Sequence, residues 1–182
     1  MQKILLLVAM REELSTPPAP HWTVVHIGVG KVNAAWRCAD ALAAHRPDLV
    51  VNFGTAGAVT KGLHGLVEVG AALQRDMDVR ALGLPLGATP FEEGSEEIRF
   101  APAPLTCGTG DSFANAAPEL PCDVVDMELY PIAKICRAAG VPLRAFKYIS
   151  DSADDTAPRD WRAALRHAEN AFLQRLQQGH LL

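Results

Sequence analysis

Short runs of consecutive apolar residues alternate with longer amphipathic segments along most of this chain. The apolar runs cover Ile4–Ala9, Thr23–Ile27, Asp48–Phe53, Gly65–Leu73, Asp123–Met127 and Leu143–Ile149. The amphipathic segments have helical spacing and cover Lys31–His45, Glu128–Ala139 and Asp160–Gln178. Unbroken apolar runs are typical of strands buried on both faces, and their alternation with helices favours parallel connections. The pattern predicts an α/β fold, a three-layer domain in which helices flank a central mixed, mainly parallel sheet.

The length of 182 residues and the hydrophobic content of 49% favour one domain spanning residues 1–182. The net charge of -4, without a Lys/Arg cluster, predicts no nucleic acid and no anionic membrane as partner. The first apolar run is short and leads into Arg11–Glu13, which argues against a signal peptide or a membrane span. The cysteines lie far apart and predict reduced thiols in a cytoplasmic protein, at Cys38, Cys107, Cys122 and Cys136.

Residues 80–119 interrupt the alternation of strands and helices. They are rich in Pro, Gly and Glu and have no sustained periodicity, which predicts irregular structure. Such a segment is either a loop that covers a site or a surface insertion.

Two acidic residues lie where predicted strands end. Glu128 follows the run that ends at Met127, and Asp151 follows the run that ends at Ile149. Ligands bind at the carboxyl ends of strands in open parallel sheets, so both residues are candidates for one shared site. Each also has a structural alternative, because Asp151 suits a helix N-cap and Glu128 suits the first turn of a helix.

Glycine-bearing loops at residues 28–31, 54–57 and 108–113 allow a close backbone approach to a ligand. The first loop lacks the third glycine of a dinucleotide fingerprint, and none ends in the Gly-Lys-Ser/Thr of a triphosphate-binding loop. The six histidines show no metal-ligand spacing. We therefore expect a small-molecule ligand, no cofactor and no metal.

Six segments in chain order resemble the purine nucleoside phosphorylase and nucleosidase superfamily, and within it the 5'-methylthioadenosine/S-adenosylhomocysteine nucleosidases. They are Ala9–Glu13, Gly28–Val32, Asn52–Gly57, Thr109–Asn115, Asp126–Glu128 and Ile149–Asp154. The resemblance implies a nucleoside phosphorylase-like fold and cleavage of the N-ribosidic bond of a purine nucleoside, of adenosine type and modified at the 5' position. It also implies a homodimer in which the neighbouring subunit closes the 5' pocket.

The resemblance implies three catalytic residues. Asp151 matches the acid that delivers a proton to purine N7, and partial burial keeps such an acid protonated at neutral pH. Glu128 matches the glutamate that accepts hydrogen bonds from the ribose hydroxyls. Glu13, or its neighbour Glu12, matches the residue that activates the attacking water, unless both are solvated loop charges.

The resemblance also implies substrate-binding residues. Phe113 matches the residue that stacks on the base, and the Ala114 backbone holds the purine edge. Core packing is the alternative for Phe113, and a simple turn is the alternative for Thr55. The other positions implied in binding are Met127 beside the sugar, Thr55, Val29, Met10 and Lys147.

The choice between water and phosphate depends on the group that binds the nucleophile. Phosphorylases of this superfamily usually carry an arginine where this chain has Asn52, and an acidic Glu13 would repel phosphate, so water is favoured. A phosphorylase and a non-catalytic nucleoside-binding protein remain the alternatives. Lys147 replaces the arginine that these nucleosidases place near the water, and the shorter chain leaves the 5' substituent open. Residues 75–79 enter either the pocket or a subunit interface.

Overall fold

The computed structural model describes residues 2–15, 17–114, 116–152 and 157–179, and no side chain of residues 157–163. The strands in these ranges are β1 (Ile4–Val8), β2 (Trp22–His26), β3 (Leu49–Ala58), β4 (Gly65–Gln74), β5 (Ile98–Arg99), β6 (Leu105–Thr109), β7 (Val124–Asp126) and β8 (Leu143–Asp151). The helices are α1 (Lys31–His45), α2 (Leu129–Ala139), α3 (Ala157–Gln177) and the 3-10 turn η1 (Arg80–Leu82). Every element expected from the sequence is present, although β3 continues from Phe53 to Ala58.

The strands pair into one mixed sheet. Its order is β2-β1-β3-β7-β6-β4-β5, and β8 pairs with both β3 and β4. The β1–β2, β1–β3, β3–β8, β4–β6 and β6–β7 pairs are parallel, whereas β3–β7, β4–β5 and β4–β8 are antiparallel. Because β8 bridges β3 and β4, the strands β3, β7, β6, β4 and β8 close into a ring. The predicted mixed, mainly parallel sheet is confirmed.

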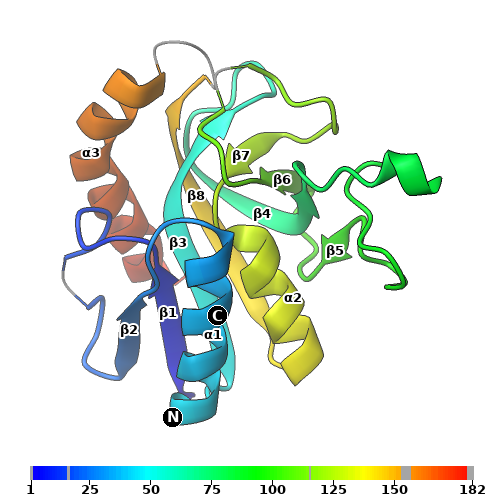
Figure 1. Cartoon of the computed structure of the whole chain (residues 1–182). Coiled ribbons are helices and arrows are strands. Elements are labelled where there is room, and N and C mark those ends of the chain that lie inside the picture. The colour runs from blue at the N-terminus through cyan, green and yellow to red at the C-terminus, as the bar shows by residue number, and fades with distance from the viewer. Residues whose placement is uncertain (1, 16, 115, 153–156, 180–182) are drawn as a thin grey trace.

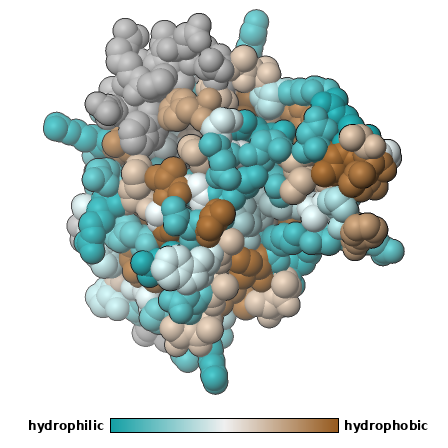
Figure 2. Space-filling view, viewed as in Figure 1, coloured by the Kyte–Doolittle hydropathy of each residue, from teal (hydrophilic) through white to brown (hydrophobic). Residues whose placement is uncertain are grey.

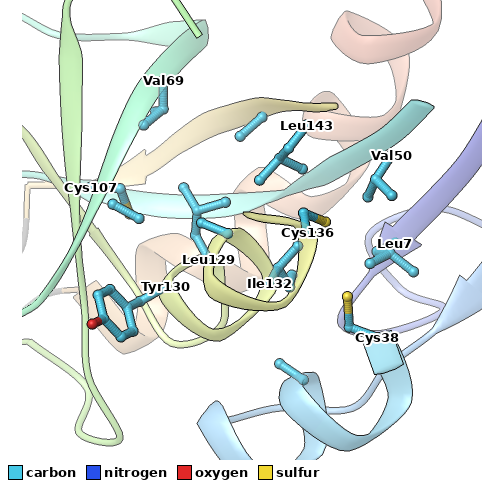
Figure 3. Close-up of a cluster of buried hydrophobic side chains, with 14 of the residues drawn as sticks. Leu7, Cys38, Val50, Val69, Cys107, Leu129, Tyr130, Ile132, Cys136 and Leu143 are labelled. Carbon is cyan, nitrogen blue, oxygen red and sulfur yellow. The ribbon is translucent and has the colours of Figure 1, made fainter. Parts of the chain in front are cut away.

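Helices cover both faces of this sheet, with α3 on one side and α1 and α2 on the other (Figure 1). The fully buried strand β1 supplies side chains to both layers. Leu5 and Leu7 pack in the cluster beneath α1 and α2, where Figure 3 shows Leu7 close to Cys38 of α1. The alternate residues pack in the cluster beneath α3, namely Ile4, Leu6 and Val8. The three-layer prediction is confirmed, and burial on both faces explains why this strand is apolar throughout.

The expectation of irregular structure throughout residues 80–119 is wrong for β5 and β6. Strand β6 lies inside the sheet, between β4 and β7. Its pairing with both neighbours stabilises it as a strand although its own sequence has no strand-like periodicity. The η1 segment projects away from the sheet at the right of Figure 1. Within the described ranges, no helix has both the length and the apolar character that a membrane span requires.

Candidate active site

A cavity of about 260 Å³ lies at the carboxyl ends of the strands. Its walls come from residues at or just beyond the ends of β1, β2, β3, β4, β6, β7 and β8. The cavity brings together all the site residues expected from the sequence except Lys147: Met10, Glu13, Val29, Thr55, Phe113, Ala114, Met127, Glu128 and Asp151. Segments far apart in the sequence therefore meet at one edge of the sheet, as expected for this class of fold.

Glu13 lies just beyond β1 and is 3% exposed, whereas its neighbour Glu12 is exposed. Glu13 Oε1 accepts hydrogen bonds from the backbone N–H and the hydroxyl of Thr55, each at 2.8 Å. Glu13 Oε2 is buried and has no hydrogen-bond partner among the described residues. Burial raises the pKa of Glu13, against the opposing effects of the Thr55 hydrogen bonds and the Lys147 charge. The structure therefore brings Glu13, and not Glu12, into the cavity.

Glu128 occupies the N-cap position of α2, but its side chain makes no capping hydrogen bond. Instead, Glu128 Oε1 accepts a hydrogen bond of 2.9 Å from the backbone N–H of Gly30, at the start of α1. Burial, followed by the nearby negative charge of Asp126, raises the pKa of Glu128 to about 8. The carboxyl group faces the cavity and not its own helix, so the structural alternative of a simple first-turn carboxylate does not describe it.

Asp151 is the last residue of β8, and its carboxylate accepts a hydrogen bond of 2.6 Å from the Ser150 hydroxyl. The register between β3 and β8 shifts here, so that Ala56 pairs with Ile149 while Gly57 pairs with Asp151. Such an irregularity redirects side chains at a strand end, and both Ser150 and Asp151 line the cavity. The alternative of a helix N-cap is wrong for Asp151, because α3 begins only at Ala157. Asp154, at the end of this motif, lies outside the described residues.

Lys147 lies beneath the cavity and does not line it. Its side chain is 1% exposed, and Nζ lies 2.8 Å from Asp126 Oδ2. Burial is the largest single effect and lowers the pKa of Lys147, but the charges of Asp126, Cys107 and Glu128 and the hydrogen bond to Asp126 together outweigh it, so the pKa is raised. Asp126 was part of a motif in the sequence analysis but was given no role, since only its place in a buried strand marked it. Asn52, like Lys147, is buried and does not line the cavity, and its Nδ2 donates a hydrogen bond to the Leu7 carbonyl at 3.1 Å.

The loop after β6 forms another wall. Phe113 lines the cavity and is 47% exposed, which excludes the core-packing alternative. Of residues 75–79, Arg75, the first residue after β4, lines the cavity, whereas the subunit-interface alternative for this segment stays a prediction. Its guanidinium donates to the Ser112 carbonyl, to the Ser112 hydroxyl at 3.2 Å and to the Gly110 carbonyl at 3.4 Å. Sequence reasoning did not foresee that Arg75 holds this loop.

An ion-pair network links the same loop to the start of α1. Lys31 Nζ lies 2.6 Å from Asp76 Oδ1, and the Lys31 backbone N–H donates to Asp111 Oδ1 at 2.7 Å. Asp76 Oδ2 accepts from the Asp111 backbone N–H at 2.9 Å. Three loops of the cavity wall are thereby joined. Among the described residues, no group of three or more His, Cys, Asp or Glu side chains is arranged to hold a metal ion.

The family model described as the Phosphorylase superfamily matches residues 19–105 and 95–178. The chain belongs to this superfamily. A 5'-methylthioadenosine/S-adenosylhomocysteine nucleosidase of Exiguobacterium is 32% identical over an alignment of 161 residues, and the match covers 74% of this chain and 69% of that protein. The protein of the same name from Actinobacillus succinogenes is 34% identical over an alignment of 156 residues, and the match covers 71% of this chain and 67% of that protein. The relationship to these two proteins shows that this chain is an N-glycosyl hydrolase.

Solved structures of superfamily members share the fold. The Helicobacter pylori 5'-methylthioadenosine/S-adenosyl homocysteine nucleosidase superposes with a TM-score of 0.86 at 23% identity, over 97% of each chain. The Streptococcus pyogenes S-adenosylhomocysteine nucleosidase, solved with 5-methylthiotubericidin, gives a TM-score of 0.82 at 22% identity, over 96% of this chain and 94% of that one. These likenesses confirm the nucleoside phosphorylase-like architecture.

Proposed function

We propose that this chain hydrolyses the N-ribosidic bond of an adenosine-type purine nucleoside that carries a 5' substituent. The observation that carries the proposal is the meeting of Glu13, Glu128 and Asp151 in one cavity. Nucleosidase chemistry needs an acid at the base, a carboxylate near the sugar and a group that activates water on the opposite face of the ring. The relatives from Exiguobacterium and Actinobacillus, which are named as nucleosidases of 5'-methylthioadenosine and S-adenosylhomocysteine, support the same substrate class.

In this proposal Asp151 protonates purine N7, so that the base leaves as a neutral molecule. Phe113 stacks on the base, and the Ala114 backbone holds its edge. Glu128 accepts hydrogen bonds from the ribose hydroxyls, and Met127 packs against the sugar. The negative charge near the ring then favours the positive charge that develops on the ribosyl group in the transition state.

Glu13 activates the water. Its Oε1 accepts two hydrogen bonds from Thr55. Its Oε2 is buried and has no hydrogen-bond partner among the described residues, so it can accept a hydrogen bond from a water molecule. Burial raises the pKa of Glu13, which makes its carboxylate a stronger base than an exposed one. A protein that only bound nucleosides would have no use for a buried carboxyl group at this position, because burying it costs stability.

Water is favoured over phosphate by the way this chain uses the start of α1. The first backbone N–H groups of a helix form a natural anion site, but the N–H groups of Gly30 and Lys31 already bind the carboxylates of Glu128 and Asp111. A phosphate ion at this place would meet two acidic side chains. The phosphorylase alternative therefore has no vacant anion site in this loop.

The test is base release from 5'-methylthioadenosine, S-adenosylhomocysteine, 5'-deoxyadenosine, adenosine and inosine, each with and without phosphate. We expect phosphate-independent release from a 5'-modified adenosine, a loss of at least about 100-fold in kcat for Asp151→Asn and for Glu13→Gln, and no loss for the control Glu12→Gln. Release that requires phosphate would establish the phosphorylase alternative. Tight binding without release from any substrate would establish the nucleoside-binding alternative.

We also propose a homodimer, with the cytoplasm as its location. Helix α1 carries Val32 and Trp36, which are 78% and 60% exposed. Figure 2 shows apolar surface on the face where α1 lies and on the segment that carries η1, where Leu82 is 69% exposed. Apolar side chains that gather on a surface are typical of contact sites. Sedimentation should give a dimer that Trp36→Glu dissociates, and a wild-type monomer at micromolar concentration would contradict the proposal.

A further inference from the structure

The first turn of α2 is capped by residues other than its own N-cap residue. Asp126 Oδ2 accepts a hydrogen bond of 2.9 Å from the Leu129 backbone N–H, and Thr109 Oγ1 accepts one of 2.9 Å from the Tyr130 backbone N–H. The first N–H groups of a helix need such acceptors, and the N-cap side chain normally provides one. Here β6 and β7 provide both acceptors, so the Glu128 carboxylate is released from capping.

These capping groups are joined to a buried ammonium. Lys147 Nζ lies 2.8 Å from Asp126 Oδ2, and the Thr109 hydroxyl donates to Asp126 Oδ1 at 2.5 Å. The three side chains come from β8, β7 and β6, and they are 1%, 6% and 0% exposed in the order Lys147, Asp126, Thr109. A buried carboxylate is tolerated only when it is paired and fully hydrogen-bonded, and both conditions hold for Asp126.

We propose that Thr109, Asp126 and Lys147 act together as positioning residues that hold the Glu128 carboxylate at the cavity. Glu128 follows Asp126 by two residues and precedes the capped turn, so the cap fixes the backbone from which its side chain starts. Thus fixed, Glu128 Oε1 reaches the Gly30 N–H at 2.9 Å and the group faces the cavity. The inference rests on the proposed function, in which Glu128 holds the ribose.

The ammonium also balances the charge under the cavity. The titratable groups that act on Lys147 are Asp126 of β7, Cys107 of β6 and Glu128 at the start of α2, and Lys147 in turn acts on Glu13 after β1. Removal of the ammonium leaves Asp126 buried and unpaired beside Glu128. Two adjacent carboxylates without a cation repel each other, so one of them must move or take up a proton.

The experiment measures the affinity for 5'-methylthiotubercidin, a nucleoside in which carbon replaces purine N7, so that binding is measured without turnover. Lys147→Met should weaken this affinity by about tenfold or more and move the pH profile of binding upward. Lys147→Arg, which keeps the charge, should bind within about threefold of the wild type. Asp126→Asn combined with Lys147→Met should recover most of the affinity, because asparagine still offers an oxygen to Leu129 and no unpaired charge remains.

Arg144→Met is the matched control. Arg144 lies on the same strand as Lys147 and pairs with Glu68 at 2.7 Å, away from the cavity lining. If Lys147→Met loses no more affinity than Arg144→Met, or if the double variant stays as weak as the single one, the positioning role is wrong. Should Lys147→Met fail to fold, Thr109→Val removes one capping acceptor at constant charge and should still weaken binding severalfold; unchanged affinity there would overturn the proposal.

A crystal structure of the folded variant separates this inference from the proposed function. Lys147→Met should lengthen the distance between Glu128 Oε1 and the Gly30 nitrogen beyond the 2.9 Å of the wild type. This readout needs neither substrate nor turnover. If the wild type fails to bind or cleave any nucleoside, the proposed function fails, whereas an unmoved Glu128 in the variant makes the positioning role fail by itself.

Discussion

Thr55 donates both its backbone N–H and its hydroxyl to the same oxygen of Glu13, each at 2.8 Å. This double contact fixes the rotamer of a carboxyl group that is 3% exposed. It also leaves Oε2 as the oxygen without a partner among the described residues. A buried carboxylate oxygen in that state is costly, and a water molecule held there would remove the cost.

Removal of the Thr55 hydroxyl should therefore slow the reaction more than it weakens binding. We expect Thr55→Val to lower kcat about tenfold, since it loses one hydrogen bond to an ionised base. Thr55→Ser keeps the hydroxyl and should stay close to the wild type. The measurement is the rate of base release at saturating substrate, and a valine variant with the wild-type kcat would refute the role given to this contact.

Binding of the nucleoside should release a proton at Glu128. In the free protein its pKa of about 8 keeps the group mostly protonated at pH 7, whereas ribose hydroxyls donate to the ionised form. Affinity should therefore rise as the pH increases toward 8. Calorimetry in buffers of different ionisation enthalpy measures the proton directly. Glu128→Gln should release less than the wild type, and equal release from both would show that another group titrates.

The raised pKa of Glu128 also makes the free energy of unfolding depend on pH. Because burial raises the folded pKa of Glu128 from 4.5 to about 8, the folded state binds this proton more tightly than the unfolded chain. Its stabilising contribution is complete below about pH 4.5 and is lost as the pH rises to about 8, with a slope of up to about 1.4 kcal/mol per pH unit. Urea unfolding at pH 5.5 and at pH 8 measures this loss. The difference in the free energy of unfolding between the two pH values should be smaller for Glu128→Gln than for the wild type.

The loop that carries Phe113 should depend on the contacts of Asp76. Asp76→Asn weakens the pairing with Lys31, so the loop loosens and KM should rise severalfold with little change in kcat. Because Lys31 and Asp76 are partly exposed, salt should also raise the wild-type KM. Asp78→Asn is the control, since Asp78 lies on the exterior beside Arg80. Equal KM values for both variants would exclude the anchoring role.

One aromatic stack should contribute strongly to the attachment of helix α3, beside the other apolar side chains of the cluster beneath that helix. The rings of Phe172 on α3 and Phe53 on β3 lie 4.2 Å apart between centroids at an interplanar angle of 11°, and Phe172 is completely buried. Phe172→Ala should lower the free energy of unfolding by about 3–5 kcal/mol. Phe91→Ala, at a fully exposed residue, should change it by less than about 0.5 kcal/mol. Urea unfolding measures both, and similar values for the two variants would contradict this account.

Local sequence signals were sufficient for most of the fold. The apolar runs and the helical spacing predicted six strands and three helices, because burial on two faces or on one helix face repeats along the chain itself. Strand β6 escaped prediction because its five residues, Leu105–Thr109, derive their order from pairing with β4 and β7. Such pairing joins segments that are distant in sequence, so the spacing of apolar residues within one segment does not predict it.

The sequence alone placed Glu128 and Asp151 at one edge of the sheet, since carboxyl ends of parallel strands meet there, and the family resemblance added Glu13 or Glu12. Only the tertiary structure decided which of the neighbouring polar side chains line the cavity and which pair with one another beneath it. It turned Lys147 away from the cavity and toward Asp126, and it brought Arg75 into the wall. The physical reason is that the direction and protonation of a buried polar side chain depend on partners from other strands, whereas its position along a strand depends on the chain alone.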